Sequence, residues 1–160
     1  MTSLPAFATL ARVPSARRSV LSTLALATAL AAAAPVEAAR PTAVERAVVR
    51  VVNDARAARS IAPVRFAWPL QARSHRYAAY LRRTGRFEHA GGLPPRTREN
   101  LAWATANVAS AHAIIRIWLR SPSHRANLLW PSARRIGLGV ARGPYRGYRD
   151  VRVAVARLRP

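Results

Sequence analysis

Two histidines and one glutamate are the side chains in this chain best suited to chemistry in a single pocket. His89 lies in Phe87-Glu88-His89-Ala90-Gly91-Gly92, Glu99 begins Glu99-Asn100-Leu101-Ala102, and His124 follows Ser121-Pro122-Ser123. Imidazole nitrogen and carboxylate oxygen are both zinc ligands, and an open zinc centre takes three protein ligands plus water. A metal held by His89, Glu99 and His124 would activate water or polarise a carbonyl. The three residues therefore predict a site for zinc or another divalent metal, without deciding between binding and catalysis.

A second interpretation of the same residues needs no metal. The three side chains are far apart in the chain and form no local zinc motif. His89 and His124 would then fix loops through hydrogen bonds, with Glu99 as an acceptor. His75 and His112 fall on expected helices without ligand spacing, so neither is assigned to the site.

Other hydrolytic arrangements find little support in the residue types. The chain has no cysteine, and the serines beside His124 belong to no Gly-x-Ser-x-Gly turn. A glycosidase needs two acids across the sugar. Two of the few acids, Glu45 and Asp54, are expected on the polar face of the first helix. The composition therefore argues against a cell-wall glycosidase.

Residues 1–38 have the pattern of a secretory signal peptide. Arginines precede an apolar run at 19–34, and Val36-Glu37-Ala38 fits a cleavage site. Arg17-Arg18 also allows a twin-arginine signal as an alternative. The remaining residues, 39–160, are expected to form one secreted, periplasmic or cell-envelope domain. They contain no stretch long and apolar enough to cross a membrane.

The charge is strongly positive, with 27 basic residues and a formal net charge of +21. Every basic residue is an arginine, and the arginines are scattered over all segments. Such a domain is attracted nonspecifically to anionic surfaces. Nucleic acid is not expected as a partner, because the chain has export features and no aromatic-plus-basic recognition motif.

Hydrophobic periodicity and turn residues predict helices first and a β-hairpin last. The first helix opens at Pro41-Thr42, the second begins at Pro69, and the third is expected to be capped by Asn107. The remaining elements are a strand at 101–103, a helical turn at 125–130, and strands at 136–140 and 150–158. The expected fold class is α+β, with helices packed around a small, mainly antiparallel sheet.

The ordered motifs resemble those of the CAP superfamily, the cysteine-rich secretory, antigen-five and pathogenesis-related proteins. The resemblance is to short bacterial secreted members with an SCP domain, and it covers roughly residues 44–158. It implies an α-β-α sandwich whose cleft holds two histidines and acidic residues, and in relatives a divalent metal, often zinc. His89 and His124 match the cleft histidines, and Glu99 matches the glutamate of the Gly-Glu-Asn motif.

The chain departs from the family pattern at two positions. Ser121 stands where eukaryotic members carry a second cleft glutamate, and Arg98 replaces the glycine before Glu99. Asn100 and Asn127 are expected to fix the cleft loops by hydrogen bonds. Arg125 is expected to pair with Glu99 or with the last carbonyls of the third helix.

Three functions remain open on this basis. The first is a binding or interaction module, whose unknown ligand is a metal, a small polar group, a lipid or an envelope polymer. The second is a metal-dependent hydrolase of low activity in the cell envelope, and the third is a structural protein with a vestigial cleft. The missing second acid favours the first and third over the second.

Overall fold

The computed structural model describes residues 40–107 and 109–160, so the expected signal peptide at 1–38 lies outside the described residues. Helices and strands follow one another in an α+β arrangement. In chain order they are α1 (Ala43–Ala57), β1 (Arg65–Phe66), α2 (Trp68–Thr84), β2 (Arg98–Thr105), α3 (Ala111–Arg120), α4 (Pro122–Leu128), β3 (Arg135–Tyr145) and β4 (Tyr148–Arg159).

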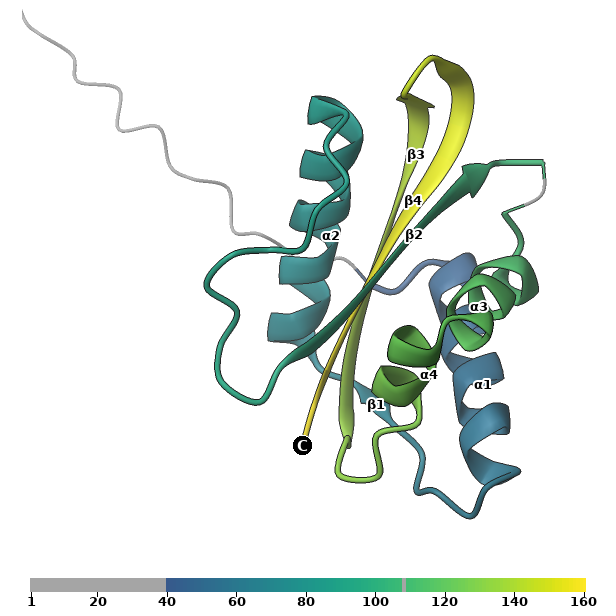
Figure 1. The fold of residues 1–160 in the computed structure, drawn as a ribbon, viewed down its shortest axis with the longest axis vertical. Coiled ribbons are helices and arrows are strands. Elements are labelled where there is room, and N and C mark those ends of the chain that lie inside the picture. Colours follow the sequence, from purple (N-terminus) through teal and green to yellow (C-terminus); the bar gives the residue numbers. More distant parts are fainter. Residues whose placement is uncertain (1–39, 108) are drawn as a thin grey trace, which may run out of the picture. The chain divides into compact units, whose positions relative to one another are not determined.

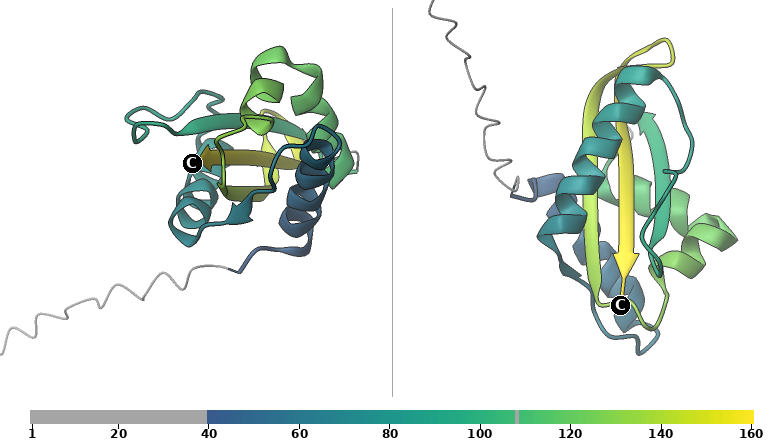
Figure 2. Two further views of the ribbon diagram at one scale, coloured as in Figure 1. Left: turned by 90° about the horizontal axis from the view of Figure 1, so that it is seen from below. Right: turned by 90° about the vertical axis from the view of Figure 1, so that its left-hand side faces the viewer.

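The four strands form one mixed sheet in the order β1-β3-β4-β2. Only β1 and β3 are parallel, whereas β4 is antiparallel to both β3 and β2. Helix α2 covers one face of the sheet, and α1, α3 and α4 lie on the other (Figures 1 and 2). Each face has its own cluster of buried apolar residues. The prediction of an α-β-α sandwich with a mainly antiparallel sheet is confirmed.

Helix α1 begins with a capping box that reaches into the core. The Thr42 side chain accepts a hydrogen bond from Glu45 N, and Glu45 Oε2 accepts one from Thr42 N at 2.9 Å. The expectation that Glu45 lies on the polar face is wrong, because its side chain is fully buried. Its other oxygen, Oε1, accepts from Val140 N at 3.0 Å, so this carboxylate connects α1 to β3.

The end of α1 is fixed by the buried side chain of Arg56. Its guanidinium donates to the carbonyl oxygens of Ala62, Leu128, Trp130 and Ala133 at 2.7–3.1 Å. Desolvation lowers the pKa of Arg56, and the charge of Arg134 lowers it further. These bonds satisfy carbonyls at the end of α4 and in the following turn, so Arg56 determines where α4 lies against α1.

Helix α2 packs unusually close to the sheet because β3 presents glycine there. A Cβ atom added to Gly137 would lie 2.1 Å from the carbonyl carbon of Leu70, and one added to Gly139 would lie 2.3 Å from that of Ser74. Polar bonds hold the contact, since Ser74 Oγ donates to Gly137 O and Leu138 N donates to Gln71 Oε1.

Element boundaries differ from the sequence prediction at several places, three of which concern α3, α4 and β2. Helix α3 is capped by Ser110, whose side chain accepts from Ala113 N, and not by Asn107. Helix α4 begins at Pro122, a residue suited to the first helical turn, so it starts earlier than expected. Strand β2 begins at Arg98 and thus includes Glu99, which places this carboxylate on the rigid sheet.

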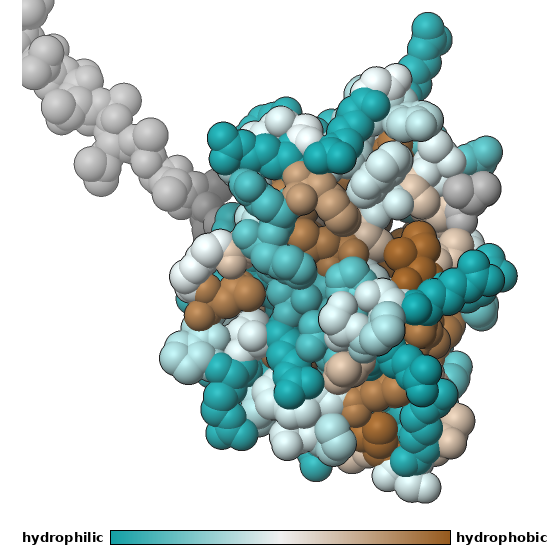
Figure 3. Space-filling view, viewed as in Figure 1, coloured by the Kyte–Doolittle hydropathy of each residue, from teal (hydrophilic) through white to brown (hydrophobic). Residues whose placement is uncertain are grey.

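In the part of the chain that the structure describes, no helix has the length and hydrophobicity needed to span a membrane. Hydrophilic side chains cover much of the face shown in Figure 3, and hydrophobic residues appear there as separate patches. Among the described residues, the large apolar side chains that are exposed are Trp68, Phe87, Ile117 and Tyr148.

Candidate functional site

The Glu99 carboxylate is buried and has hydrogen-bond donors at both oxygens. Its side chain is 1% exposed, and Oε1 accepts from Ala90 N at 3.0 Å. His89 Nδ1 lies 2.9 Å from the same oxygen. Because a carboxylate only accepts, Nδ1 carries the hydrogen, and in the neutral ring the lone pair is on Nε2. The His89 side chain is 59% exposed, so Nε2 belongs to an accessible ring.

Arg157 is the residue of this site that sequence reasoning missed. Its Nε donates to Glu99 Oε2 at 2.8 Å, and the pair is nearly inaccessible to water. The guanidinium carbon also lies 5.0 Å from the ring centre of Tyr77. A signal existed in β4, because Arg157 occupies the same face of the strand as Val151, Val153 and Val155. An arginine in register with Glu99 on an apolar face indicates a buried ion pair.

Two partners were expected for Arg125, Glu99 or the last carbonyls of α3, and the first of these pairings is wrong. Arg157 takes that place from the neighbouring strand, while Arg125 lies exposed on α4. Tyr77 lies near the pair and donates its hydroxyl to Glu88 O at 2.8 Å. Burial raises the pKa of Tyr77, and the charge of Glu99 raises it further.

His124 lies on α4, and two asparagines attach that helix to β2. Asn100 Nδ2 donates to His124 O, and Asn127 Nδ2 donates to Asn100 Oδ1, both at 2.9 Å. Asn127 Nδ2 also lies 3.3 Å from Glu99 O. The backbone of His124 is therefore held against the strand that carries Glu99.

The His124 imidazole is partly buried, and its Nδ1 atom is buried without a hydrogen-bond partner among the described residues. Desolvation lowers the pKa of His124, and the nearby charge of His89 lowers it further. Both effects favour the neutral ring, which is the form that offers a lone pair to a ligand.

An NMR titration is expected to give His124 a midpoint below about 6.5, the value of an unperturbed histidine. In His89→Ala the midpoint is expected to rise without reaching that value, because burial remains. Since the unfolded chain binds this proton first, the protein is expected to lose stability as the pH falls below about 6.5. His112→Ala, a change at an exposed histidine on α3, serves as the control. A wild-type midpoint at or above the ordinary value would contradict this prediction.

Within residues 40–107 and 109–160, no group of three His, Cys, Asp or Glu side chains is placed to hold a metal ion. The physical reason lies at Glu99, whose two oxygens already accept from His89, Ala90 and Arg157. The site thus offers imidazole nitrogens as ligand atoms, and the Glu99 carboxylate accepts a hydrogen bond from the His89 ring.

The other side chains considered in the sequence lie outside this site. His75 Nε2 contacts the buried Glu45 at 2.9 Å and Gln71 at 2.8 Å, in a network under α2. Ser121 Oγ and Ser123 Oγ lie 3.3 Å from each other, and neither has a hydrogen bond to His124. The structure therefore gives no Ser-His pair near His124.

A family model named "Cysteine-rich secretory protein family" (CAP) matches residues 49–156, which is more than half of the chain. The chain belongs to the CAP family. The resemblance seen in the motifs is thereby confirmed, although this CAP domain contains no cysteine. A comparison with curated proteins gave no match.

Solved structures with the same fold include bacterial and metal-bound proteins. An outer surface protein from Borrelia burgdorferi is 20% identical, with a TM-score of 0.55 over 72% of this chain and 92% of that one. An extracellular protein with an SCP domain from Bacillus anthracis is 18% identical, with a TM-score of 0.54 over 72% and 40%. NaASP2 with Zn²⁺ is 10% identical, with a TM-score of 0.57 over 72% and 78%. At these identities the likeness shows the CAP fold alone.

Proposed function

We propose that this CAP protein is an exported binding module whose cleft binds a divalent metal ion through His89 and His124. The observation that carries the proposal is the 2.9 Å contact between His89 Nδ1 and Glu99 Oε1. Histidines that bind metals usually donate their other N–H to a carboxylate, which fixes the tautomer and the ring orientation. Glu99 is suited to this orienting role, and Arg157 holds it in place.

The donor set fits a metal only in part. His89 supplies one imidazole, and the unpartnered Nδ1 of the neutral His124 ring is a group for which burial is costly without a ligand. Two nitrogen donors are fewer than a structural zinc centre uses, so weak and reversible binding is expected. The solved structure of NaASP2 is one with Zn²⁺, which makes zinc the first metal to test.

Metal-dependent hydrolysis is the less well supported alternative. A general base needs a free lone pair near the attacking water, and the Glu99 oxygens are both occupied by donors. A second acid is missing as well, because Ser121 stands at that position of the family pattern. These contacts favour a site for binding over one for catalysis.

Export to the cell envelope is part of the proposal. The signal-like residues 1–38 support it, and so do the outer-surface and extracellular proteins that share the fold. With a formal charge of +21, the chain would adhere to anionic lipids or envelope polymers. That attraction is screened by salt, so it supplies a general tether and not a specific partner.

Zinc binding measured by calorimetry tests the proposal. The wild-type protein is expected to show one saturable site that disappears in His89→Ala/His124→Ala and persists in His112→Ala. Glu99→Gln is expected to weaken binding by about 10- to 100-fold, as loss of an orienting carboxylate usually does. The absence of saturable binding, or binding that survives in the double variant, would overturn the proposal and leave the histidines with a structural role.

A further inference from the structure

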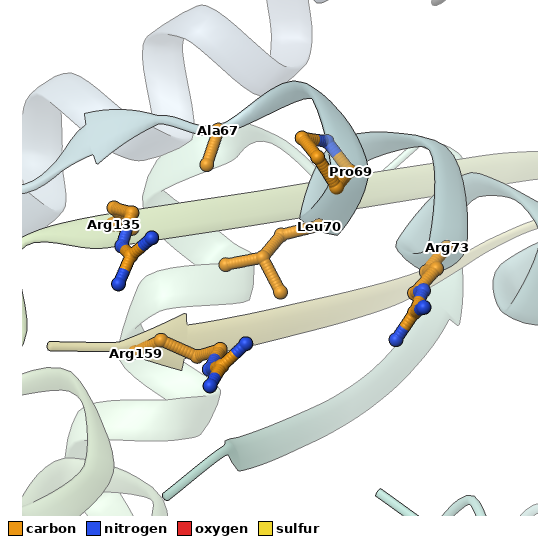
Figure 4. Close-up of a pocket in the computed structure, with 6 residues that line it drawn as sticks. All are labelled: Ala67, Pro69, Leu70, Arg73, Arg135 and Arg159. Atoms are coloured by element: carbon orange, nitrogen blue, oxygen red, sulfur yellow. The ribbon is translucent and has the colours of Figure 1, made fainter. Parts of the chain in front are cut away.

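A pocket lies at the start of α2, and none of its lining residues belongs to the site of His89, Glu99 and His124. Its volume is about 180 Å³, whereas one water molecule has a share of about 30 Å³ in the liquid. The pocket can therefore hold a group of several heavy atoms. It is lined by Ala67, Pro69, Leu70, Arg73, Arg135 and Arg159 (Figure 4).

Three arginines surround the apolar floor of this pocket. In Figure 4 the Leu70 side chain is in the middle of the view, with Arg135, Arg159 and Arg73 around it. Arg135 and Arg159 are directly opposite each other in the β3–β4 pairing. Like charges at such positions repel each other. Arg65 of β1 lies opposite Arg135 on its other side, which adds a further positive charge to the row.

No Asp or Glu side chain compensates this charge within the part of the chain that the structure describes. The ion pairs found there use other arginines and histidines, and none includes Arg73, Arg135 or Arg159. Arg135 uses only its Nε in a hydrogen bond to the described residues, donating to Pro160 O at 2.7 Å. The Nε atom of Arg159 is buried with no hydrogen-bond partner among residues 40–107 and 109–160. A buried donor without a partner is costly, so this atom points to a missing acceptor.

The backbone at the pocket also carries a positive partial charge. Helix α2 begins here at Trp68, with no acidic residue in its first turn and no side-chain cap at Ala67. The amino end of a helix is positive and favours a negative group. This effect adds to the three guanidinium groups, which carry the main attraction.

We infer that this pocket is a binding site for a phosphoryl group. A guanidinium presents a planar fork of N–H donors that matches phosphate and carboxylate oxygens. A carboxylate has only two oxygens for the three guanidinium groups. A phosphoryl group offers three or more oxygens and carries up to two negative charges. The adjacent Leu70 and Pro69 suit a phosphate ester with a short apolar portion. This inference is independent of the proposed metal site.

Calorimetry with inorganic phosphate on the whole protein, at about 150 mM salt to screen surface charge, tests the inference. One saturable site is expected in the wild type. Arg73→Gln and Arg73→Gln/Arg159→Gln are expected to weaken it by at least tenfold. The matched control is Arg83→Gln/Arg149→Gln, which removes the same charge from exposed positions outside the pocket. The single variant changes only an exposed arginine, so it does not depend on the fold tolerating Arg159→Gln.

The outcomes separate a built site from general attraction. Binding that is weakened by the pocket variants and unchanged in the control supports the phosphoryl site. Absence of saturable binding, or equal weakening in the control, overturns it. Vesicles of phosphatidylglycerol and of phosphatidylcholine then identify the source. Binding to phosphatidylglycerol that phosphate competes away assigns the group to a lipid headgroup, and phosphate binding without vesicle binding assigns it to a soluble or polymeric phosphate.

Discussion

Arg56→Ala is expected to lower the free energy of unfolding by about 4 kcal/mol, since unsatisfied buried polar groups cost about 1–3 kcal/mol each. The substitution removes the donor to four carbonyl oxygens, of which those of Leu128 and Ala133 are in buried contacts. The buried acceptors are left without their donor. The link between the end of α1 and the turn after α4 is therefore lost.

Urea unfolding followed by circular dichroism measures this loss. Arg59→Ala is the matched control, because it removes the same charge near the same helix end from an exposed residue whose one bond is to Ala55 O. Exposed substitutions of this kind change stability by about 0.5 kcal/mol or less. Equal stability of the two variants would mean that Arg56 does not hold α4 in place.

Gly137→Ala is also expected to lower the free energy of unfolding strongly, in this case through a steric clash between β3 and α2. The added Cβ would lie 2.1–2.4 Å from backbone atoms of Leu70 and Gln71, so α2 must move away from β3. Overpacking a well-packed core costs about 1–3 kcal/mol and occasionally more. The new Cβ belongs to a strand and clashes with helix backbone, so no flexible side chain can move to relieve the overlap. We expect a loss of about 3 kcal/mol in the free energy of unfolding, or failure to fold.

Gly91→Ala provides the control for the change of residue type. Nothing lies within 4 Å of a Cβ at that position, so stability is expected to change by about 0.5 kcal/mol or less. Thermal unfolding of both variants makes the comparison. A Gly137→Ala protein that melts with the wild type would show that α2 does not require glycine on β3.

These two contacts also bear on the cleft and the arginine pocket. Arg56 fixes the end of α4, the helix that carries His124, and the glycines of β3 fix the approach of α2, whose first turn lines the pocket. A loss of zinc or phosphate binding in these variants would therefore follow from displaced elements. The binding tests use His89, His124 and Arg73 for this reason, because each of them is at least partly exposed.

The sequence by itself determined the family, the fold class and most of the elements. Apolar periodicity marks α1 and α3, and the alternating valines mark β4, because burial of one face imposes these repeats. The motifs around His89, Glu99 and His124 are sufficient to identify a CAP domain from the sequence alone. Boundaries failed where competing caps were near, as with Asn107 and Ser110, since several polar residues can satisfy the first turn of a helix.

Only the tertiary structure decided how the charged groups are partnered. Glu45 has the helical spacing of a surface residue, yet it is buried because Val140 N and Gln71 supply donors from other elements. Glu99 pairs with Arg157, its register partner on β4, and not with Arg125. Likewise, Arg135 and Arg159 of the pocket are distant in the chain and meet through strand pairing. Local periodicity reports which face is apolar, whereas the partner of a buried charge depends on which strands and helices come together.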